Sequence, residues 1–288
     1  MSNRMLTVLK ANITRNLRID WKYKLNFITD LAWLAVDVIT FLFLGQVVAS
    51  SDIDNFLYEG LLKEFLVVGV IYWVIFTRAY KDGVSVIPNE AALGALGFII
   101  TNDITLSDLI AGQFSSSTIK TSVTLIIFVL PIVFILSNIP IGETTILRPL
   151  ILSPLEIIIF TLLILLISWI FMLGITILAS TINVIFKKSG PLTFLLSYLL
   201  TMLSGYFFPL EVLRTFGLAE LERVLHLIPT TDMLYSLRSM LIIGKIPSNI
   251  LFTIIVNGFI SVVLLTLAML IMRKVTRKAA YSGTLEFY

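Results

Sequence analysis

The sequence predicts an all-α membrane protein with six transmembrane helices. Six hydrophobic stretches each approach the about 20 residues that a helix needs to cross the hydrocarbon core of a bilayer. Hydrophobic residues make up 58% of the chain and charged residues 14%, whereas a soluble domain is about 25% charged. The stretches lack the two-residue alternation of strands. They cover residues 27–49, 61–80, 118–137, 155–177, 192–210 and 250–272.

The basic residues predict how these helices are oriented. Of the 21 lysines and arginines, 15 fall in residues 1–26, in the connections near 78–120 and 184–191, and after 272. Six stretches place these segments on one side, and cytoplasmic loops are the ones enriched in Lys and Arg. We therefore expect a multi-pass protein of the cell membrane with both termini in the cytoplasm. The positive charge is explained by topology, so we expect no nucleic-acid partner.

The whole chain, residues 1–288, is expected to form a single domain. Residues 1–25 precede the six-helix part, residues 26–272, and residues 273–288 form a cytoplasmic tail. Apolar residues recur at three- and four-residue steps in the first segment, with basic residues elsewhere around the same helix. This pattern predicts an interfacial amphipathic helix at the lipid headgroups, and a disordered basic leader is the alternative. The apolar positions are Leu6, Leu9, Ile13, Leu17 and Trp21.

The longest cytoplasmic connection, residues 81–117, is expected to contain two short helices. Pro88 and Asn89 are typical of a helix start, and Thr105 with Asp108 forms a capping-box pattern. The break between the two helices is expected at Asn102 and Asp103. A connection of this length with its own structure is usually functional.

The second half contains a long fourth stretch and an unusual outer segment. The fourth stretch stays apolar to about Phe186. After the fifth stretch, residues 209–229 are too polar to span a membrane and too apolar for a free loop. We expect short helices that re-enter the outer leaflet, which requires their backbone to be buried by protein. Pro229 and Asp232 are expected to start a further helix that extends through Arg238.

Asp37 is the most notable polar residue inside a predicted span. It lies near the middle of the first stretch, on the same helical face as Asp30 and Trp33. An ionised carboxylate at that depth costs about 2.5–3.5 kcal/mol, so it should face protein or water. Asp37 is therefore either a residue of a substrate path or a structural partner for a neighbouring helix.

Residues typical of enzyme chemistry are absent from the sequence. There is no cysteine and one histidine, His226, and a lone histidine is more often a surface or packing residue than a ligand. No Gly-x-x-x-x-Gly-Lys-Ser/Thr loop for ATP and no Gly-x-Ser-x-Gly elbow occurs. We predict no catalytic residue, no metal site and no cofactor held by this chain.

Two segments of the chain resemble the ABC-2 type permease family. One is Ser204-Gly-Tyr-Phe-Phe-Pro209, and the other is Leu227-Ile-Pro-Thr-Thr-Asp232 followed by Leu237-Arg238 and Gly244. The opening Trp21–Phe27 and closing Gly283–Tyr288 are also similar to many prokaryotic members. One departure is the first cytoplasmic loop, where family members often carry Glu…Gly-Thr-Leu-Glu. Here this loop continues from Glu90 as Ala-Ala-Leu-Gly-Ala-Leu-Gly97.

The resemblance implies the permease subunit of an ABC exporter, which dimerises with a second copy or a paralogous permease. A separate ABC ATPase subunit would bind ATP and Mg²⁺, and the substrate would be a hydrophobic drug, a lipid or a glycolipid. The coupling element would comprise Glu90, Leu93, Gly94, Leu96 and Gly97, with a soft linker as the alternative. The substrate path or outer gate would comprise Asp37, Gly205, Phe207, Phe208 and Pro209, with an outer cap as the alternative. A secondary transporter and a non-transporting assembly protein are the other functions that the sequence leaves open.

Overall fold

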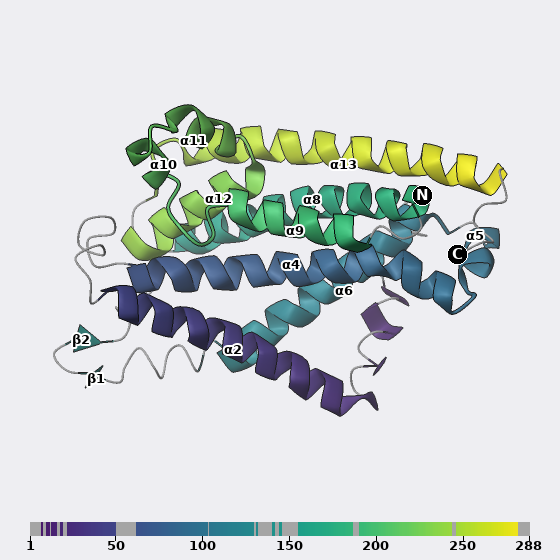
Figure 1. The fold of residues 1–288 in the computed structure, drawn as a ribbon, viewed down its shortest axis with the longest axis horizontal. Coiled ribbons are helices and arrows are strands. Elements are labelled where there is room, and N and C mark those ends of the chain that lie inside the picture. The colour runs from purple at the N-terminus through teal and green to yellow at the C-terminus, as the bar shows by residue number, and fades with distance from the viewer. Residues whose placement is uncertain are drawn as a thin grey trace.

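The protein is built from helices that run mostly along one long axis. The computed structural model describes residues 7, 10–11, 13–15, 18–19, 22–49, 62–102, 104–129, 131, 140–141, 144–145, 155–186, 190–243 and 246–281. Figure 1 shows α4, α8, α9 and α13 roughly parallel to that axis, with α2 and α6 crossing it at an angle. The expected all-α class is confirmed, apart from a two-residue strand pair, β1 (Pro140–Ile141) and β2 (Thr144–Thr145).

The helices differ widely in length. The long ones are α2 (Lys24–Ala49), α4 (Leu62–Ala92), α6 (Leu106–Thr124), α8 (Leu155–Phe186) and α13 (Ile250–Tyr281). The shorter ones are α5 (Leu96–Thr101), α9 (Gly190–Leu203), α10 (Val212–Thr215), α11 (Ala219–Leu225) and α12 (Pro229–Arg238). Two π-helical turns, η1 (Leu125–Val129) and η2 (Ser239–Ile243), directly follow α6 and α12.

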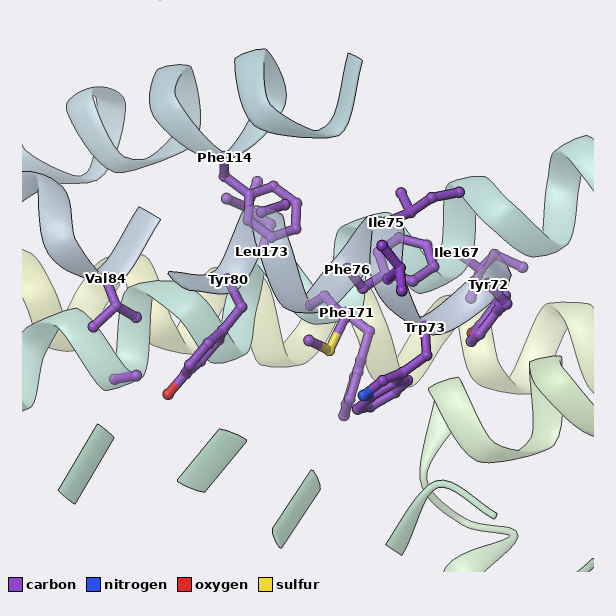
Figure 2. Close-up of a cluster of buried hydrophobic side chains, with 14 of the residues drawn as sticks. Tyr72, Trp73, Ile75, Phe76, Tyr80, Val84, Phe114, Ile167, Phe171 and Leu173 are labelled. Atoms are coloured by element: carbon purple, nitrogen blue, oxygen red, sulfur yellow. The ribbon is translucent and has the colours of Figure 1, made fainter. Parts of the chain in front are cut away.

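The core lies where α4, α6 and α8 meet. Tyr72 and Phe76 of α4 and Phe114 of α6 are almost completely buried, and Figure 2 shows them grouped with side chains of α8. Helices α8 and α13 also pack along one another. A Cβ atom on Gly174 would lie 3.2 Å from the backbone of Leu265, so the glycine permits the close approach that membrane helices use.

Within the described part of the chain, two helices are long and apolar enough to cross a membrane. Both α8 and α13 contain 32 residues and a strongly apolar window. The extension of the fourth stretch to Phe186 is therefore confirmed. The other four expected spans are not confirmed by length and composition. In particular, α9 contains only 14 residues and is about 21 Å long, because the chain turns at Ser204–Pro209 instead of continuing to residue 210.

The connection between α4 and α6 differs from the predicted one in two ways. Helix α4 does not stop before Pro88 but continues through it to Ala92, so the helix start predicted at Pro88 is wrong. Helix α4 is separated from α5 by a turn at Gly94, whose φ of 70° is accessible to glycine at little cost. The second helix, α6, is not short but continues into the third apolar stretch. The expected break at Asn102 and the Thr105 cap are confirmed, since Thr105 Oγ1 accepts from Asp108 N at 3.2 Å.

A side chain from α8 explains why α4 tolerates Pro88. Proline has no N–H group, so it leaves the Val84 carbonyl without its usual helical donor. Asn183 of α8 supplies the donor instead, with Nδ2 2.9 Å from the Val84 carbonyl oxygen. Asn183 is itself buried. The proline and the asparagine therefore form one structural unit that keeps α4 continuous.

We predict that Asn183→Leu lowers the free energy of unfolding by about 1–3 kcal/mol, the cost of leaving a buried carbonyl unpaired. In a Pro88→Ala background, residue 88 regains an N–H that can bond to Val84, so the same substitution should cost clearly less. Unfolding midpoints of the purified full chain in detergent would provide the comparison. An equal loss in both backgrounds would contradict the role given to Asn183.

Candidate functional site

Helix α12 lies at the centre of the most polar junction among the described residues. It starts at Pro229, which occupies the first helical position, where a missing N–H costs nothing. Most of α12 is buried although half of its residues are polar or charged. It packs against α8, α13 and α4. Buried polar groups need partners inside the protein, and each end of α12 finds them on other helices.

The first turn of α12 is bonded to α4, α9 and α13. The Tyr72 hydroxyl of α4 lies 3.1 Å from the Thr230 carbonyl oxygen and 2.6 Å from Ser168 Oγ of α8. Thr231 Oγ1 donates to the Leu203 carbonyl, the last of α9, at 3.3 Å. Asn257 Nδ2 of α13 donates to Asp232 Oδ2 at 2.7 Å. Three consecutive residues thus bond to three separate helices.

The last residue of α12, Arg238, bonds to three backbone carbonyls. Its Nη1 donates to Gly205 at 2.8 Å and its Nη2 to Tyr206 at 2.9 Å. Its Nε donates to the Phe65 carbonyl of α4 at 3.2 Å, and the guanidinium carbon lies 3.5 Å from the centre of the Phe65 ring. Arg238 is only 7% exposed. A buried cation with rigid, forked donors holds the turn after α9 against the start of α4.

A glycine on α4 makes room for this guanidinium. A Cβ atom on Gly69 would overlap Arg238 Nη2 and lie 3.1 Å from the Tyr206 carbonyl oxygen. The turn itself depends on Gly205, whose φ is 68°. The turn after α9 contains the carbonyls of Gly205 and Tyr206, and Arg238 supplies the hydrogen-bond donors for both.

A histidine and carboxylate pair connects the end of α11 to the first turn of α12. His226 Nδ1 lies 3.4 Å from Asp232 Oδ1, and the His226 ring meets the Tyr235 ring edge-on at 5.3 Å between centroids. The hydrogen bond to Asp232 raises the pKa of His226 above its ordinary value of 6.5, and the charges of Glu211 and Glu222 act in the same direction. Asp232 therefore connects His226 to Asn257 of α13.

The residues predicted for a substrate path or gate come together beside Arg238. Asp37 is exposed on α2 and lies near enough to Tyr206 to interact with it electrostatically. One turn further along α2, the Phe41 ring lies 5.5 Å from the Tyr206 ring and 5.7 Å from the Phe207 ring. Phe207 is 44% exposed. Gly205 is buried, and Phe208 and Pro209 are half-buried.

The residues predicted for coupling lie at the other end of the long axis, where α4 turns into α5 (Figure 1). They do not form one helix, because the turn at Gly94 separates Glu90 from Leu96. Glu90 is buried and pairs with Arg15 at 2.9 Å. Leu96 is also buried, whereas Gly97 is exposed and Leu93 is 78% exposed. Phe98, 73% exposed, adds a second apolar side chain to this surface.

Sequence reasoning did not identify several residues that hold the helices together. It placed Arg238 only at the end of a predicted helix and in a motif, and it did not single out Tyr72 and Asn257 at the junction or Asn183 beside Pro88. The available signal was an amide in an otherwise apolar helix, as for Asn183 and Asn257, because polar residues at apolar depth require partners. Neither family models nor curated proteins match the chain.

We predict that Arg238→Lys lowers the free energy of unfolding by about 3 kcal/mol. One ammonium group cannot reproduce three directed bonds to separated carbonyls, and bonds to a charged group contribute about 1.5–3 kcal/mol each. Arg223→Lys is the matched control, because the Arg223 side chain is 74% exposed. Similar midpoints for the two variants in thermal unfolding would contradict a structural role for the guanidinium.

We also predict that Gly69→Ala is destabilising, because the new methyl group displaces Arg238. Gly258→Ala is the control, since the nearest atoms to a Cβ there are 3.9 Å away, which is ordinary contact. Unfolding midpoints of both variants measure the difference. A Gly69→Ala midpoint as high as that of Gly258→Ala would show that Arg238 does not need the space.

The His226 pair predicts a pH dependence of stability. Because the folded-state pKa is raised, the contribution of His226 is fully present below pH 6.5 and is lost as the pH rises through the folded-state value. The unfolding midpoint should therefore fall as the pH is raised above 6.5. His226→Gln should reduce that fall. An unchanged fall in the variant would assign the pH dependence to other groups.

Proposed function

We propose that the chain is the transmembrane permease subunit of an ATP-binding-cassette exporter, with ATP and Mg²⁺ bound by a separate ATPase. One observation carries this proposal. Arg238 of one segment that resembles the ABC-2 family bonds directly to Gly205 and Tyr206 of the other, which lie 33 and 32 residues earlier in the sequence. Contact between them supports the interpretation that they are parts of a single motif.

The distribution of charge supports a membrane orientation for the bundle. The C-terminal end of α13, at the same end of the long axis as α5 (Figure 1), carries four exposed basic residues. They are Arg273, Lys274, Arg277 and Lys278. In the proposed orientation this end faces the cytoplasm, in keeping with the enrichment of basic residues there. Helices α10 and α11 then lie on the outer side.

The α4–α5 turn is the proposed contact with the ATPase. Its exposed Leu93 and Phe98 suit an apolar groove on a partner. Helix α4 is 31 residues long without interruption, about 46 Å, and its far end contains the Phe65 carbonyl that Arg238 binds. Movement of the turn by the ATPase would thus be transmitted through α4 to the junction at α12 and to Phe207.

The proposed gate is residues 209–229, which meets its counterpart from a second copy or a paralogous permease. Short helices are present here as α10 and α11. Exposed apolar side chains flank them, with Phe216 73% and Leu227 66% exposed, and the helices themselves carry the exposed charges of Arg214, Glu220 and Arg223. Leu210 is buried against Gly205, so a cysteine cross-link between copies is better placed at Phe207 and Phe216.

A hydrophobic substrate is supported by an apolar groove between α4, α6 and α8. Its volume is about 350 Å³, and it is lined mainly by Ile75, Phe76, Leu165 and Trp169. Thr118 and Ser122 of α6 supply its hydroxyl groups. A groove of this composition suits an acyl chain or an apolar drug better than a charged solute.

Co-purification tests the proposal. The tagged full chain, extracted in mild detergent from its native membrane, should retain an ATPase, and Leu93→Asp should lose it because a charge replaces the apolar anchor. Thr101→Asp is the control, since it adds the same charge to an exposed position of α5. Absence of an ATPase from the wild-type complex would favour a secondary transporter or an assembly protein. Loss with both variants would remove the specific role of Leu93.

A further inference from the structure

The N-terminal segment forms an open groove of about 620 Å³ with an unusual concentration of positive charge. Its lining residues are Thr7, Lys10, Ala11, Thr14, Arg15, Arg18, Ile19 and Lys22. Four of these eight residues are cationic and no acidic residue is among them. The groove is separate from the junction at α12 and from the α4–α5 turn, and neither of those proposed roles uses it.

We propose that this groove binds the phosphate-bearing headgroup of an anionic phospholipid. Basic residues close to an anionic membrane surface contribute about 1 kcal/mol each to lipid attraction, and arginine pairs with phosphate through two parallel bonds. Ala11 and Ile19 provide an apolar wall for the part of the lipid below the phosphate. The proposal rests on the membrane location given under the proposed function.

Exposed apolar side chains near the groove favour a lipid over an acidic protein segment. Ile19 is 46% exposed, Tyr23 54% and Leu25 76%. Ile19 directly follows Arg18, and Tyr23 and Leu25 alternate with Lys22 and Lys24 where the chain enters α2. A surface that combines such side chains with cations is typical of a helix lying at a membrane interface, and a purely acidic peptide would leave these apolar groups uncovered.

An ion pair connects this groove to the proposed coupling element. Arg15 lines the groove, and its Nη1 also donates to Glu90 Oε1 at 2.9 Å. The Arg15 side chain is 45% exposed whereas that of Glu90 is 9% exposed. A headgroup in the groove would therefore lie next to the end of α4. The ion pair would hold the lipid site and the ATPase contact in one fixed geometry.

Lipid retention by the delipidated full chain tests the proposal. In native mass spectrometry from detergent, the wild type should bind phosphatidylglycerol at least about fivefold more strongly than phosphatidylcholine, since each basic residue near the headgroup contributes on the order of fivefold. Lys10→Gln with Arg18→Gln should weaken phosphatidylglycerol binding about tenfold or more by the same reasoning. Arg15 is left unchanged so that the pair with Glu90 persists.

Arg273→Gln with Arg277→Gln is the matched control, because it removes two exposed cations from α13. Equal weakening in the control, or equal binding of both lipids by the wild type, would overturn the proposal. Displacement of the lipid by millimolar inorganic phosphate would assign the groove to a free anion instead. Full lipid retention by the Lys10 and Arg18 variant, together with loss of the co-purified ATPase, would assign it to an acidic segment of that partner.

This assay needs no ATPase, so its failure and that of the proposed function are distinguishable. A chain that co-purifies with an ATPase but shows no lipid preference would contradict only the headgroup site. A chain that stays dispersed in buffer without detergent would contradict the membrane location on which both proposals rest.

Discussion

The structure depends on one constraint: every backbone polar group in its apolar interior must find a partner within the protein. Regular helices meet this requirement unaided, but the chain departs from regular helix at Pro88 and in the turn after Leu203. Pro88 leaves the Val84 carbonyl without its usual helical donor, and Asn183 supplies one. The carbonyls of Gly205 and Tyr206 lie beyond the end of α9, and Arg238 binds both. Each departure is stabilised by a side chain from another helix, so local irregularity and tertiary packing are inseparable here.

The bonds from Asn183 and Arg238 lie toward opposite ends of α4. Together they determine whether the helix can transmit a displacement from one end to the other. Asn183 keeps α4 continuous near the α4–α5 turn, while Arg238 connects its first turns to α12. Helix α12 is in turn bonded to α13 through Asp232 and Asn257. A rigid helix attached firmly at both ends is suited to carry a displacement from one side of the bundle to the other, which is what coupling to an ATPase would require.

Apolar stretches and helix caps were predictable from the sequence because they depend on local residue patterns. The extent of α8, the start of α13 at Ile250, the Thr105 cap and the start of α12 at Pro229 follow from such patterns, whereas α13 continues to Tyr281, beyond the expected end at residue 272. The passage of α4 through Pro88 was not predictable, because it depends on Asn183, about 95 residues later. The early end of α9 was missed for the same reason, since Arg238 makes the turn at Gly205 possible. The proximity of Asp37 to Tyr206 likewise arises from packing of α2 that no local pattern encodes.

The most direct test of a membrane-crossing bundle is the accessibility of single cysteines at its two ends, since the natural chain contains none. Leu93→Cys and Phe216→Cys would place exposed thiols at the α4–α5 turn and beside α10. A membrane-impermeant maleimide applied to intact cells should label Phe216→Cys and leave Leu93→Cys unlabelled, with the reverse pattern in inverted membrane vesicles. Labelling of both positions from the same side would contradict a bundle that spans the membrane along its long axis.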